Sequence, residues 1–344
     1  MPFDEPRATA RRTHHHAVAA RLSAVDDIEL AALLASARPL GSGIGGSSAL
    51  LDLPDGKVFV KRIPLTAIEA RHPRSTADLF GLPVFYQYGI GSAGFGAWRE
   101  LAAHEAATEW VLTGEHAGFP LLHHWRVLPG AAGAVGDHDL EESVAHWGGS
   151  AAIRERLTAI AASQLSLVVF LEYVPRSLSA WLPEQPPEAF ARIERELADT
   201  AAFLRERGWI HFDAHYGNVV TDGHRCHLTD FGLAVGAGFD LSPAERAFFD
   251  AHRDYDLAYG AAHLVEHHIA ERYRGELDRM AFVTAWAAGT RPPEVPGTVA
   301  DILDRHARTT IVMAGFFREL IEGDKSAPYP AADLARAIAS PGCA

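Results

Sequence analysis

The sequence predicts an α+β protein with two lobes, a small one built on an antiparallel sheet with one main helix and a larger, mainly helical one. Apolar runs of strand length, bounded by turn residues, crowd the first half of the chain, whereas helical periodicity dominates after Pro175. At 344 residues the chain also exceeds one ordinary compact domain. We therefore expect two lobes that share a cleft.

Residues 1–38 are expected to form an N-terminal arm followed by a helix. An apolar helical pattern begins at about residue 24 and runs until Pro39, which stops it. The triplet His14–His15–His16 precedes this pattern without further ligands in view. We therefore expect a mobile arm there rather than a metal site.

Residues 39–174 are expected to form the small lobe. The glycine-rich stretch "LGSGIGG" leads into an apolar strand, a Pro-Asp-Gly turn and a second strand that ends at Lys61, which predicts a β-hairpin. An irregular insertion fills residues 64–97, and loops of this length are often functional. The main helix follows at about 98–113. Two more strands, "FPLLHHWRVLP" and "SLVVFLEYVP", are separated by a Gly/Asp-rich surface loop and a short helix around 150–163.

Residues 175–344 are expected to form the larger lobe. Helical periodicity predicts helices at 187–207, about 243–271, 275–289, 298–322 and 330–339. The longest strongly apolar run of the whole chain, "LSLVVFL", lies before this region and is far too short to span a bilayer. Its length is that of a buried strand.

Composition narrows the class of protein and its partners. Hydrophobic residues make up 48% and charged residues 22%, which is typical of a folded globular protein. A net charge of −13 argues against nucleic acid or an anionic membrane as the main partner. The two cysteines, Cys226 and Cys343, cannot form a disulfide framework, and no secretory segment is recognisable. A cytoplasmic protein is expected.

The glycine-rich stretch contains the pattern Gly41-x-Gly43-x-x-Gly46. Alone this spacing is weak evidence, because it also opens dinucleotide-binding folds, where the loop leads into a helix. Here it leads into a hairpin whose second strand ends in Lys61. Glycines let a backbone close over polyphosphate, and a lysine on the neighbouring strand supplies positive charge. The context therefore indicates a phosphate-binding loop.

A second group of polar residues lies in "HFDAHYGN" (211–218) and "LTDFGLA", which contains Asp230. Nucleoside triphosphates are bound through Mg²⁺, a hard ion that prefers oxygen ligands. Asn218 and Asp230 supply such oxygens at a spacing that a strand-turn-strand can bring together. Asp213 is then available to take the proton of an attacking hydroxyl.

The ordered set of motifs resembles the protein-kinase-like superfamily, from about Leu40 to about Gly260. The resemblance implies a bilobal kinase fold and binding of ATP, with GTP as an alternative, together with Mg²⁺. It also implies that Lys61 holds the α- and β-phosphates and is steadied by a glutamate from the following helix. "HEAATEWVL" looks like the matching pattern of aminoglycoside phosphotransferases, which gives that role to Glu105, with Glu100 as second candidate.

Further roles follow from the same resemblance. "FLEYV" is similar to the hinge of these enzymes, where Glu172, Tyr173 and Val174 would offer backbone groups to the adenine edge. The resemblance likewise makes Asp213 the catalytic base. Asn218 and Asp230 would be the metal ligands.

Smaller departures distinguish the branches of the superfamily. Protein kinases usually carry Arg before the catalytic Asp and Lys two residues after it, whereas this chain has Phe212 and His215. "HFDAHYGN" is closer to the His-Gly-Asp-x-His-x-x-Asn pattern of aminoglycoside and choline kinases, although Phe212 replaces their usual small residue. His215 would then lie near the transferring phosphoryl group, donating a hydrogen bond or supporting Asn218.

Other features are more typical of protein kinases. These are the spelling Asp-Phe-Gly, the segment "SPAE", and an aspartate, Asp254 or Asp256, that resembles the helix residue steadying the catalytic loop. Only nine residues separate Gly232 from Ser242, however, which is too few for a loop that cradles a peptide. We therefore expect transfer of the γ-phosphate of ATP to a hydroxyl of a small molecule, such as an antibiotic or another natural product. A divergent protein serine/threonine kinase and a pseudokinase binding module are the alternatives.

Overall fold

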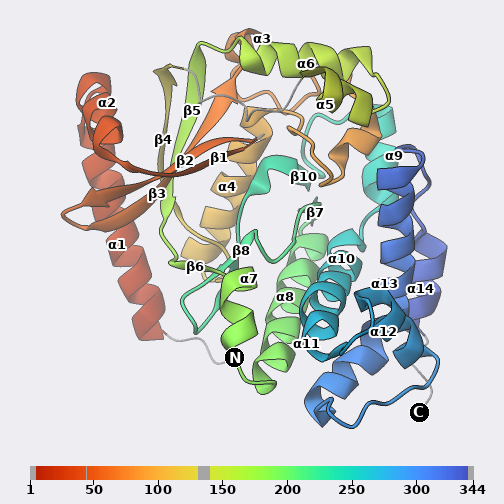
Figure 1. The fold of residues 1–344 in the computed structure, drawn as a ribbon. Coiled ribbons are helices and arrows are strands. Elements are labelled where there is room, and N and C mark those ends of the chain that lie inside the picture. Colours follow the sequence, from red (N-terminus) through yellow and green to blue (C-terminus); the bar gives the residue numbers. More distant parts are fainter. Residues whose placement is uncertain (1–4, 44, 131–139, 340–344) are drawn as a thin grey trace. The chain divides into compact units, whose positions relative to one another are not determined.

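The computed structural model describes residues 5–43, 45–130 and 140–339, and the chain divides into two compact units. The first unit comprises residues 1–87, 91–174 and 231–233, and the second comprises 88–90, 175–230 and 234–344. The fold class is α+β, with a five-stranded antiparallel sheet in the first unit and mostly helices in the second (Figure 1). The surface loop expected before the short helix falls largely at 131–139. Those residues and Cys343 lie outside the described residues.

The sheet of the first unit has the strand order β1-β2-β3-β5-β4, and all neighbouring strands are antiparallel. The strands are β1 (Arg38–Gly43), β2 (Gly46–Leu53), β3 (Gly56–Leu65), β4 (Leu122–Pro129) and β5 (Leu165–Glu172). The predicted hairpin is β2–β3, and Gly56 at its turn has φ +134°, a value that favours glycine. Within the glycine-rich stretch, residues 40–43 belong to β1 and Gly46 begins β2, so most of it is strand rather than a loop without regular structure.

Both faces of this sheet are covered, which explains the unbroken apolar run of β5. Val168 and Phe170 point into one cluster with helices α1 (Glu5–Ala24) and α2 (Asp27–Ser36). The alternate residues Leu167, Val169 and Leu171 point into a second cluster with α4 (Ala97–Leu112). Figure 1 shows α1 and α2, in red, on one side of the sheet and α4 on the other. A central strand buried on both faces has no polar side to alternate with.

The expectation of a mobile N-terminal arm is wrong. Residues 5–24 form α1, which packs along β4. Val18 and Leu22 are fully buried, and Arg11 holds the Glu172 carboxylate at 2.6 Å. The buried positions 15, 18 and 22 make a narrow helical stripe in an otherwise polar sequence. The helix is therefore fixed by the sheet it covers, and His15 lies 3.0 Å from His123 on β4 instead of extending into solvent.

The insertion begins later than expected, because β3 continues past Lys61 to Leu65. The rest of the segment is largely irregular, as expected, but its first part is firmly anchored. It contains the short helices α3 (Ala67–Arg71) and η1 (Val84–Gln87). Thr66 and Glu69 form a capping box at the start of α3. The Glu69 carboxylate also accepts from the Ala97 N–H at 2.9 Å and lies 3.1 Å from Arg156. Arg156 belongs to α6 (Ala151–Ala161), which follows α5 (Leu140–His146). One buried carboxylate thus connects three helices of the first unit.

The second unit consists of helices packed around α13, with two small sheets. Its helices are α7 (Leu178–Trp181), η2 (Leu182–Glu184), α8 (Glu188–Glu206), α9 (Pro243–Ala251), α10 (Tyr255–Leu264), the π-helical turn η4 (Val265–Ala270), α11 (Glu271–Tyr273), α12 (Arg279–Ala287), α13 (Gly297–Glu322) and α14 (Ala331–Ala339). Its strands are β6 (Arg176–Ser177), β7 (Trp209–Ile210), β8 (Val219–Thr221), β9 (Cys226–Leu228) and β10 (Val235–Gly236). The helices predicted at 187–207, 298–322 and 330–339 are confirmed within two residues.

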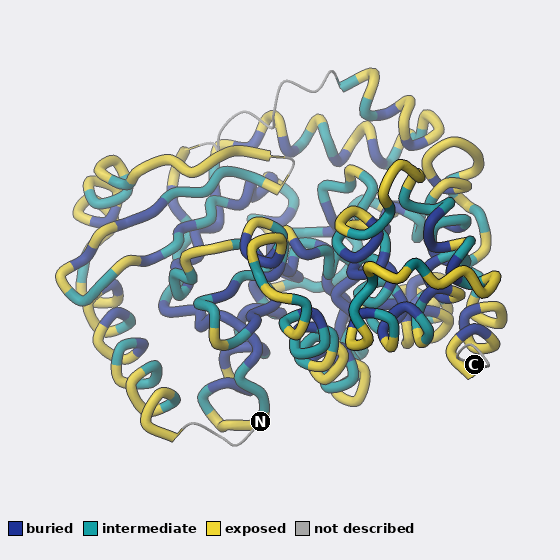
Figure 2. Tube along the Cα trace, turned by 60° about the horizontal axis from the view of Figure 1, so that its bottom comes forward, coloured by how far each residue is buried: buried dark blue, intermediate teal, exposed yellow. Residues whose placement is uncertain are grey.

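Two predicted helices need correction. The helix expected at 275–289 begins only at Arg279, after the N-cap Asp278, and ends at Ala287. The segment expected as a single helix at about 243–271 is interrupted after Ala251 and resumes at Tyr255. His252 caps the first part and Asp254 precedes the second. In Figure 2 the helices change colour along their length between exposed and buried, as amphipathic helices do. Two amphipathic helices joined by a tight turn give the same apolar periodicity as one long helix, and periodicity alone does not separate them.

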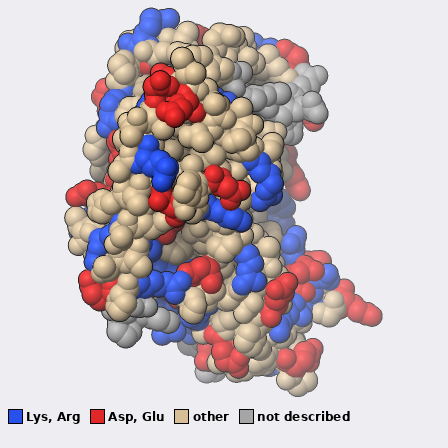
Figure 3. Space-filling model, turned by 90° about the vertical axis from the view of Figure 1, so that its left-hand side faces the viewer, with Lys and Arg blue, Asp and Glu red and all other residues tan. Residues whose placement is uncertain are grey.

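Charged side chains on the face shown in Figure 3 are mixed in sign, with blue and red groups side by side. Opposite charges also form ion pairs at α1 and α2, namely Arg21 with Asp55 and Arg126 with Asp27. Among the described residues, no helix is both long enough and apolar enough to cross a membrane.

Candidate functional site

Lys61 of the first unit forms a buried ion pair with Glu100. Because side chains alternate along β3, Lys61 shares the sheet face of Ile63, which is the face that α4 covers. Its Nζ donates to Glu100 Oε1 at 2.7 Å, and the two side chains are only 12% and 4% exposed. A charge-assisted bond in such a setting holds the ammonium group in one place.

The expectation that Glu105 pairs with Lys61 is wrong. Glu105 accepts two bonds from Arg74, at 3.0 and 2.7 Å, near the protein surface. Successive residues of an α-helix turn by about 100°, so Glu105 lies roughly 140° around α4 from Glu100. Glu100 therefore faces the sheet, whereas Glu105 does not. Glu100, the second candidate in the sequence, is the partner of Lys61.

The glycines of the predicted phosphate-binding stretch differ in how much space a side chain would have. Gly43 and Gly46 pair across the β1–β2 turn, and Gly46 has φ +121°. A Cβ on Gly46 would lie 2.0 Å from the Arg62 carbonyl oxygen, so no other residue fits there. Around Gly41 and Gly43 an added Cβ would meet nothing within 4 Å. Gly45, which the motif spacing skips, is the glycine whose Cβ would approach Lys61 Nζ, at 3.5 Å.

The predicted hinge segment begins at the end of β5. The Glu172 N–H donates to the Leu121 carbonyl at 2.8 Å, and its carboxylate holds Arg11. The N–H and the carboxylate of Glu172 are therefore both bonded within the first unit. Val174 is the last residue of the first unit before the chain enters the second at Pro175. The adenine-binding roles of Glu172 and Val174 stay predictions.

In the second unit, Asp213 and Asn218 are held together within one loop. Asn218 Nδ2 donates to the Asp213 carboxylate at 2.9 Å and to the Asp213 carbonyl at 3.0 Å. The Asp213 N–H in turn donates to His211 Nδ1 at 3.3 Å. Because the amide nitrogen of Asn218 points at Asp213, its oxygen is the atom that a metal ion can use. The loop thus orients a carboxylate and presents an amide oxygen beside it.

His215 lies next to this pair in a defined tautomer. The Gly217 N–H donates to His215 Nδ1 at 3.0 Å, so Nε2 carries the proton in the neutral ring. Nε2 lies 3.9 Å from the Asp213 carboxylate. Burial lowers the pKa of His215, while the charge of Asp230 raises it and His267 lowers it further. A neutral imidazole at neutral pH, with its N–H near Asp213, follows from these contacts.

Asp256 of α10 fixes the start of the same loop, and this contact decides between Asp254 and Asp256. Its carboxylate accepts from the N–H groups of His211 at 2.6 Å and Phe212 at 3.0 Å. Burial raises the pKa of Asp256 to about 6, although both hydrogen bonds lower it. Asp254 instead forms an exposed ion pair with Arg205.

Phe212, the residue before Asp213, has an uncommon backbone conformation. Its φ is +64°, in the left-handed region that favours glycine. The ring is fully buried and packs against Phe248 and Tyr255, with ring centroids 5.6 and 4.9 Å away. Aromatic packing and the Asp256 hydrogen bond together offset the strain of this backbone conformation.

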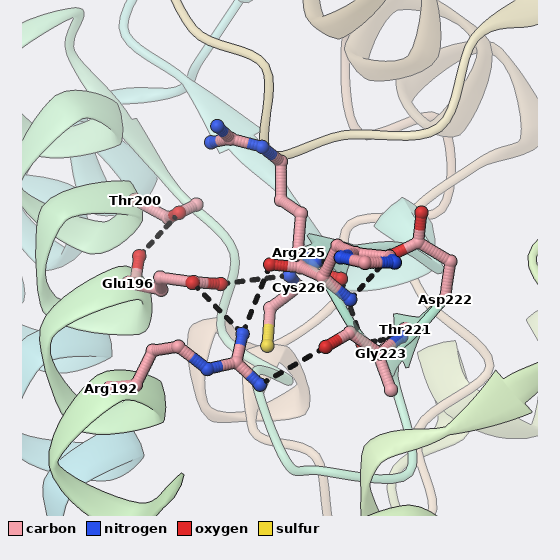
Figure 4. Close-up of polar contacts among 9 residues, drawn as sticks. Arg192, Glu196, Thr200, Thr221, Asp222, Gly223, Arg225 and Cys226 are labelled. Atoms are coloured by element: carbon pink, nitrogen blue, oxygen red, sulfur yellow. Dashed lines mark hydrogen bonds and ion pairs between the residues drawn. The ribbon is translucent and has the colours of Figure 1, made fainter. Parts of the chain in front are cut away.

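A hairpin of β8 and β9 carries Asn218 at its start and leads to Asp230 at its end. The Thr229 N–H donates to the Asn218 carbonyl at 2.9 Å, which brings Asp230 next to Asn218. Figure 4 shows how α8 holds the far end of this hairpin. Glu196 accepts from the Cys226 N–H at 2.9 Å, and Arg192 donates to the carbonyls of residues 223 and 224. Asp230 has φ +63°, a second strained position in this region.

Gly89, within the insertion, was not recognised from the sequence. It belongs to the second unit, and a Cβ on it would lie 2.3 Å from the Asp213 carboxylate. Only glycine allows the backbone to approach the carboxylate so closely. The insertion is rich in glycine, which hinted at close backbone contacts. No sequence motif relates the position of Gly89 to that of Asp213.

Comparison with known proteins adds no assignment. No protein-family model matches the chain, and no curated protein is significantly similar to it. The contacts described above are the basis for a functional proposal.

Proposed function

We propose that the chain is a phosphotransferase of the protein-kinase-like type that moves the γ-phosphate of ATP to a hydroxyl of a small molecule. The observation that carries this proposal is the arrangement of the loop in the second unit. There the Asp213 carboxylate is held by Asn218, and Asp230 follows at the end of the same hairpin. The resemblance to aminoglycoside and choline kinases supports the same reaction class.

The donor set of this loop suits Mg²⁺. Among the described residues, no group of three or more His, Cys, Asp or Glu is arranged to hold a metal by itself. Mg²⁺ in nucleotide sites is usually bound by one or two protein oxygens, with phosphates and water completing the shell. Asn218 Oδ1 and the Asp230 carboxylate would hold the ion, which when bound neutralises the phosphate oxygens.

Asp213 would act as the base. Its carboxylate takes the proton of the acceptor hydroxyl as that oxygen forms a bond to the γ-phosphorus, and the bond to the β-phosphate oxygen breaks to release ADP. The Asn218 amide fixes the carboxylate during this step. His215 Nε2–H, neutral because burial lowers the pKa of the ring, would donate a hydrogen bond without adding charge.

In the first unit, Lys61 and the β1–β2 turn would hold the phosphates. Gly45 lies beside the Lys61 ammonium group, so the turn leaves the backbone close to it without an intervening side chain. The Glu100 carboxylate fixes Lys61 and would keep the charge aimed at the α- and β-phosphates.

An acceptor screen tests the proposal directly. The purified chain is incubated with γ-labelled ATP, Mg²⁺ and pools of aminoglycosides, nucleosides, macrolides, amino alcohols and mixed proteins. Magnesium-dependent transfer of label to a small alcohol is the expected result. Label on protein substrates or on the chain itself would favour a divergent serine/threonine kinase. Absence of magnesium-dependent ATP turnover with every pool would favour a pseudokinase and contradict the proposal.

A matched pair on α4 tests the role of the Lys61 ion pair. Glu100→Gln removes the charge that fixes Lys61 and should lower ATP turnover by about tenfold or more, because misplaced phosphates lose orientation. Glu105→Gln removes an exposed pair with Arg74 and should leave turnover nearly unchanged. Steady-state kinetics with varied ATP compares the two. Equal loss in both variants would contradict the assignment of Glu100.

A further inference from the structure

The second unit contains an apolar cavity of about 310 Å³ that plays no part in the proposed reaction. It lies among α8, α10, α13 and α14, and every residue that lines it belongs to this unit. Small residues open the space where α8 and α10 face one another, namely Ala198, Ala201, Gly260 and Ala261. The cavity falls in the size range of pockets that bind small molecules.

One polar group on the cavity wall has no partner. Thr309 of α13 is 1% exposed, and among the described residues nothing hydrogen-bonds its Oγ1. The next residue, Thr310, donates to the His306 carbonyl at 2.9 Å, as threonines in helices commonly do. A buried hydroxyl is normally satisfied, and one left open on the wall of a cavity marks the place where a ligand can bond.

The charged side chains around the cavity already have ion-pair or hydrogen-bond partners. At one end Glu194 accepts from Arg305 at 2.6 Å and contacts His306 at 2.7 Å. The Asp256 carboxylate, which also lines the cavity, accepts the two loop N–H groups described above. An anionic ligand would meet two carboxylates, and a cationic one would compete with Arg305. The lining therefore suits a neutral molecule.

We propose that this cavity is a binding site for a neutral, apolar small molecule with one hydroxyl group, which hydrogen-bonds to Thr309. A cavity of about 150 Å³ already holds benzene, so one of this size takes roughly ten to twelve carbon atoms. Ala214 and Tyr216, which flank His215, form part of the wall. A bound molecule would lie against the loop that carries Asp213.

The probes are chosen to match this chemistry. 2-Naphthol has ten carbon atoms, one hydroxyl and intrinsic fluorescence; naphthalene lacks the hydroxyl, and 2-naphthoate carries a negative charge instead. Binding is measured by fluorescence and calorimetry in the absence of ATP, Mg²⁺ and any acceptor. We expect saturable binding of 2-naphthol, about fivefold weaker binding of naphthalene, and still weaker binding of 2-naphthoate.

Two glycines provide a matched pair of variants. A Cβ on Gly260 or on Gly315 would meet nothing within 4 Å, and both residues lie inside helices, where leucine is favoured over glycine. Only Gly260 lines the cavity. Gly260→Leu fills it and should weaken 2-naphthol binding by about tenfold or more, whereas Gly315→Leu should leave binding unchanged. Circular dichroism and thermal melting verify that both variants are folded.

Thr309→Val provides a test that does not depend on filling the cavity. The change keeps the shape of the side chain and removes the unpartnered hydroxyl, so folding should be retained. It should abolish the preference for 2-naphthol over naphthalene while leaving naphthalene binding unchanged. Absence of saturable 2-naphthol binding, equal binding to the Gly260→Leu variant, or a preference that survives Thr309→Val would each overturn the proposal. Because ATP is absent, these outcomes are independent of phosphate transfer.

Discussion

Replacing Asp213 by alanine is expected to lower phosphate transfer by about 10²- to 10⁴-fold, the range that a positioned general base contributes. ATP binding should change little, because Lys61, Asn218 and Asp230 are retained. The structural reason is that Asn218 Nδ2 already holds the Asp213 carboxylate in one orientation, 2.9 Å away. Single-turnover kinetics measures the transfer step, and equilibrium binding of an ATP analogue measures the affinity.

The control for this variant is Asp199→Ala, which makes the same chemical change at an exposed position of α8 in the same unit. It should behave as the wild type in both measurements. Transfer at the wild-type rate in Asp213→Ala would exclude the proposed base. Loss of ATP binding together with transfer would instead mean that Asp213 supports the nucleotide.

Replacing Glu69 by alanine should strongly destabilise the first unit. Glu69 is 1% exposed. Its carboxylate accepts hydrogen bonds from the N–H groups of Thr66 and Ala97 and forms an ion pair with Arg156. The N-cap of α4 has no side-chain hydrogen bond of its own, so Glu69 supplies the missing acceptor from outside the helix. Removing one partner of a buried ion pair costs about 3–5 kcal/mol of unfolding free energy.

Glu141→Ala is the matched control for this prediction. Glu141 pairs with Arg154, which lies two residues from Arg156 on the same helix, but both side chains are largely exposed. Exposed pairs of this kind contribute little to stability. Urea unfolding followed by tryptophan fluorescence compares the variants. Similar midpoints for Glu69→Ala and Glu141→Ala would show that the buried carboxylate does not hold the three helices together.

The strands and helices that could be predicted are those whose buried residues form a regular pattern of apolar residues in the sequence. The run "LSLVVFL" predicted a buried strand, and the structure shows in addition that helices cover β5 on both faces of the sheet. The long helices α8 and α13 each bury one stripe, which repeats clearly over several turns. An element that buries a whole face needs apolar residues at regular intervals, and this regularity made β5, α8 and α13 recognisable in the sequence.

The features that were missed depend on tertiary contacts. Helix α1 buries only three residues, His15, Val18 and Leu22, so its periodic signal is weak against many polar neighbours. The choice between Glu100 and Glu105 required the rotation of α4 about its axis. A clue was present, since Glu100 shares a helix face with the apolar positions Ala103, Ala107 and Val111.

The polar residues of the loop in the second unit could be identified in the sequence. The distant residues that hold this loop in place could not. Asp213 and Asn218 could be named from the sequence because their spacing is short. The contact of Asp256 with His211 and Phe212 spans more than forty positions, and no local pattern selects Asp256 over Asp254. The left-handed conformation of Phe212 was equally hidden, because it is maintained by rings that are distant in sequence.

The route of the chain has a consequence for attempts to dissect the protein. Each unit contains a short segment from the other half of the sequence. Phe231 packs against His104 in the first unit, and Tyr88 packs against Phe212 in the second. A fragment that stops at Val174 would lack Phe231, and one that starts at Pro175 would lack Tyr88. Neither half is a transferable module, and grafting or recombination has to move both halves as one piece.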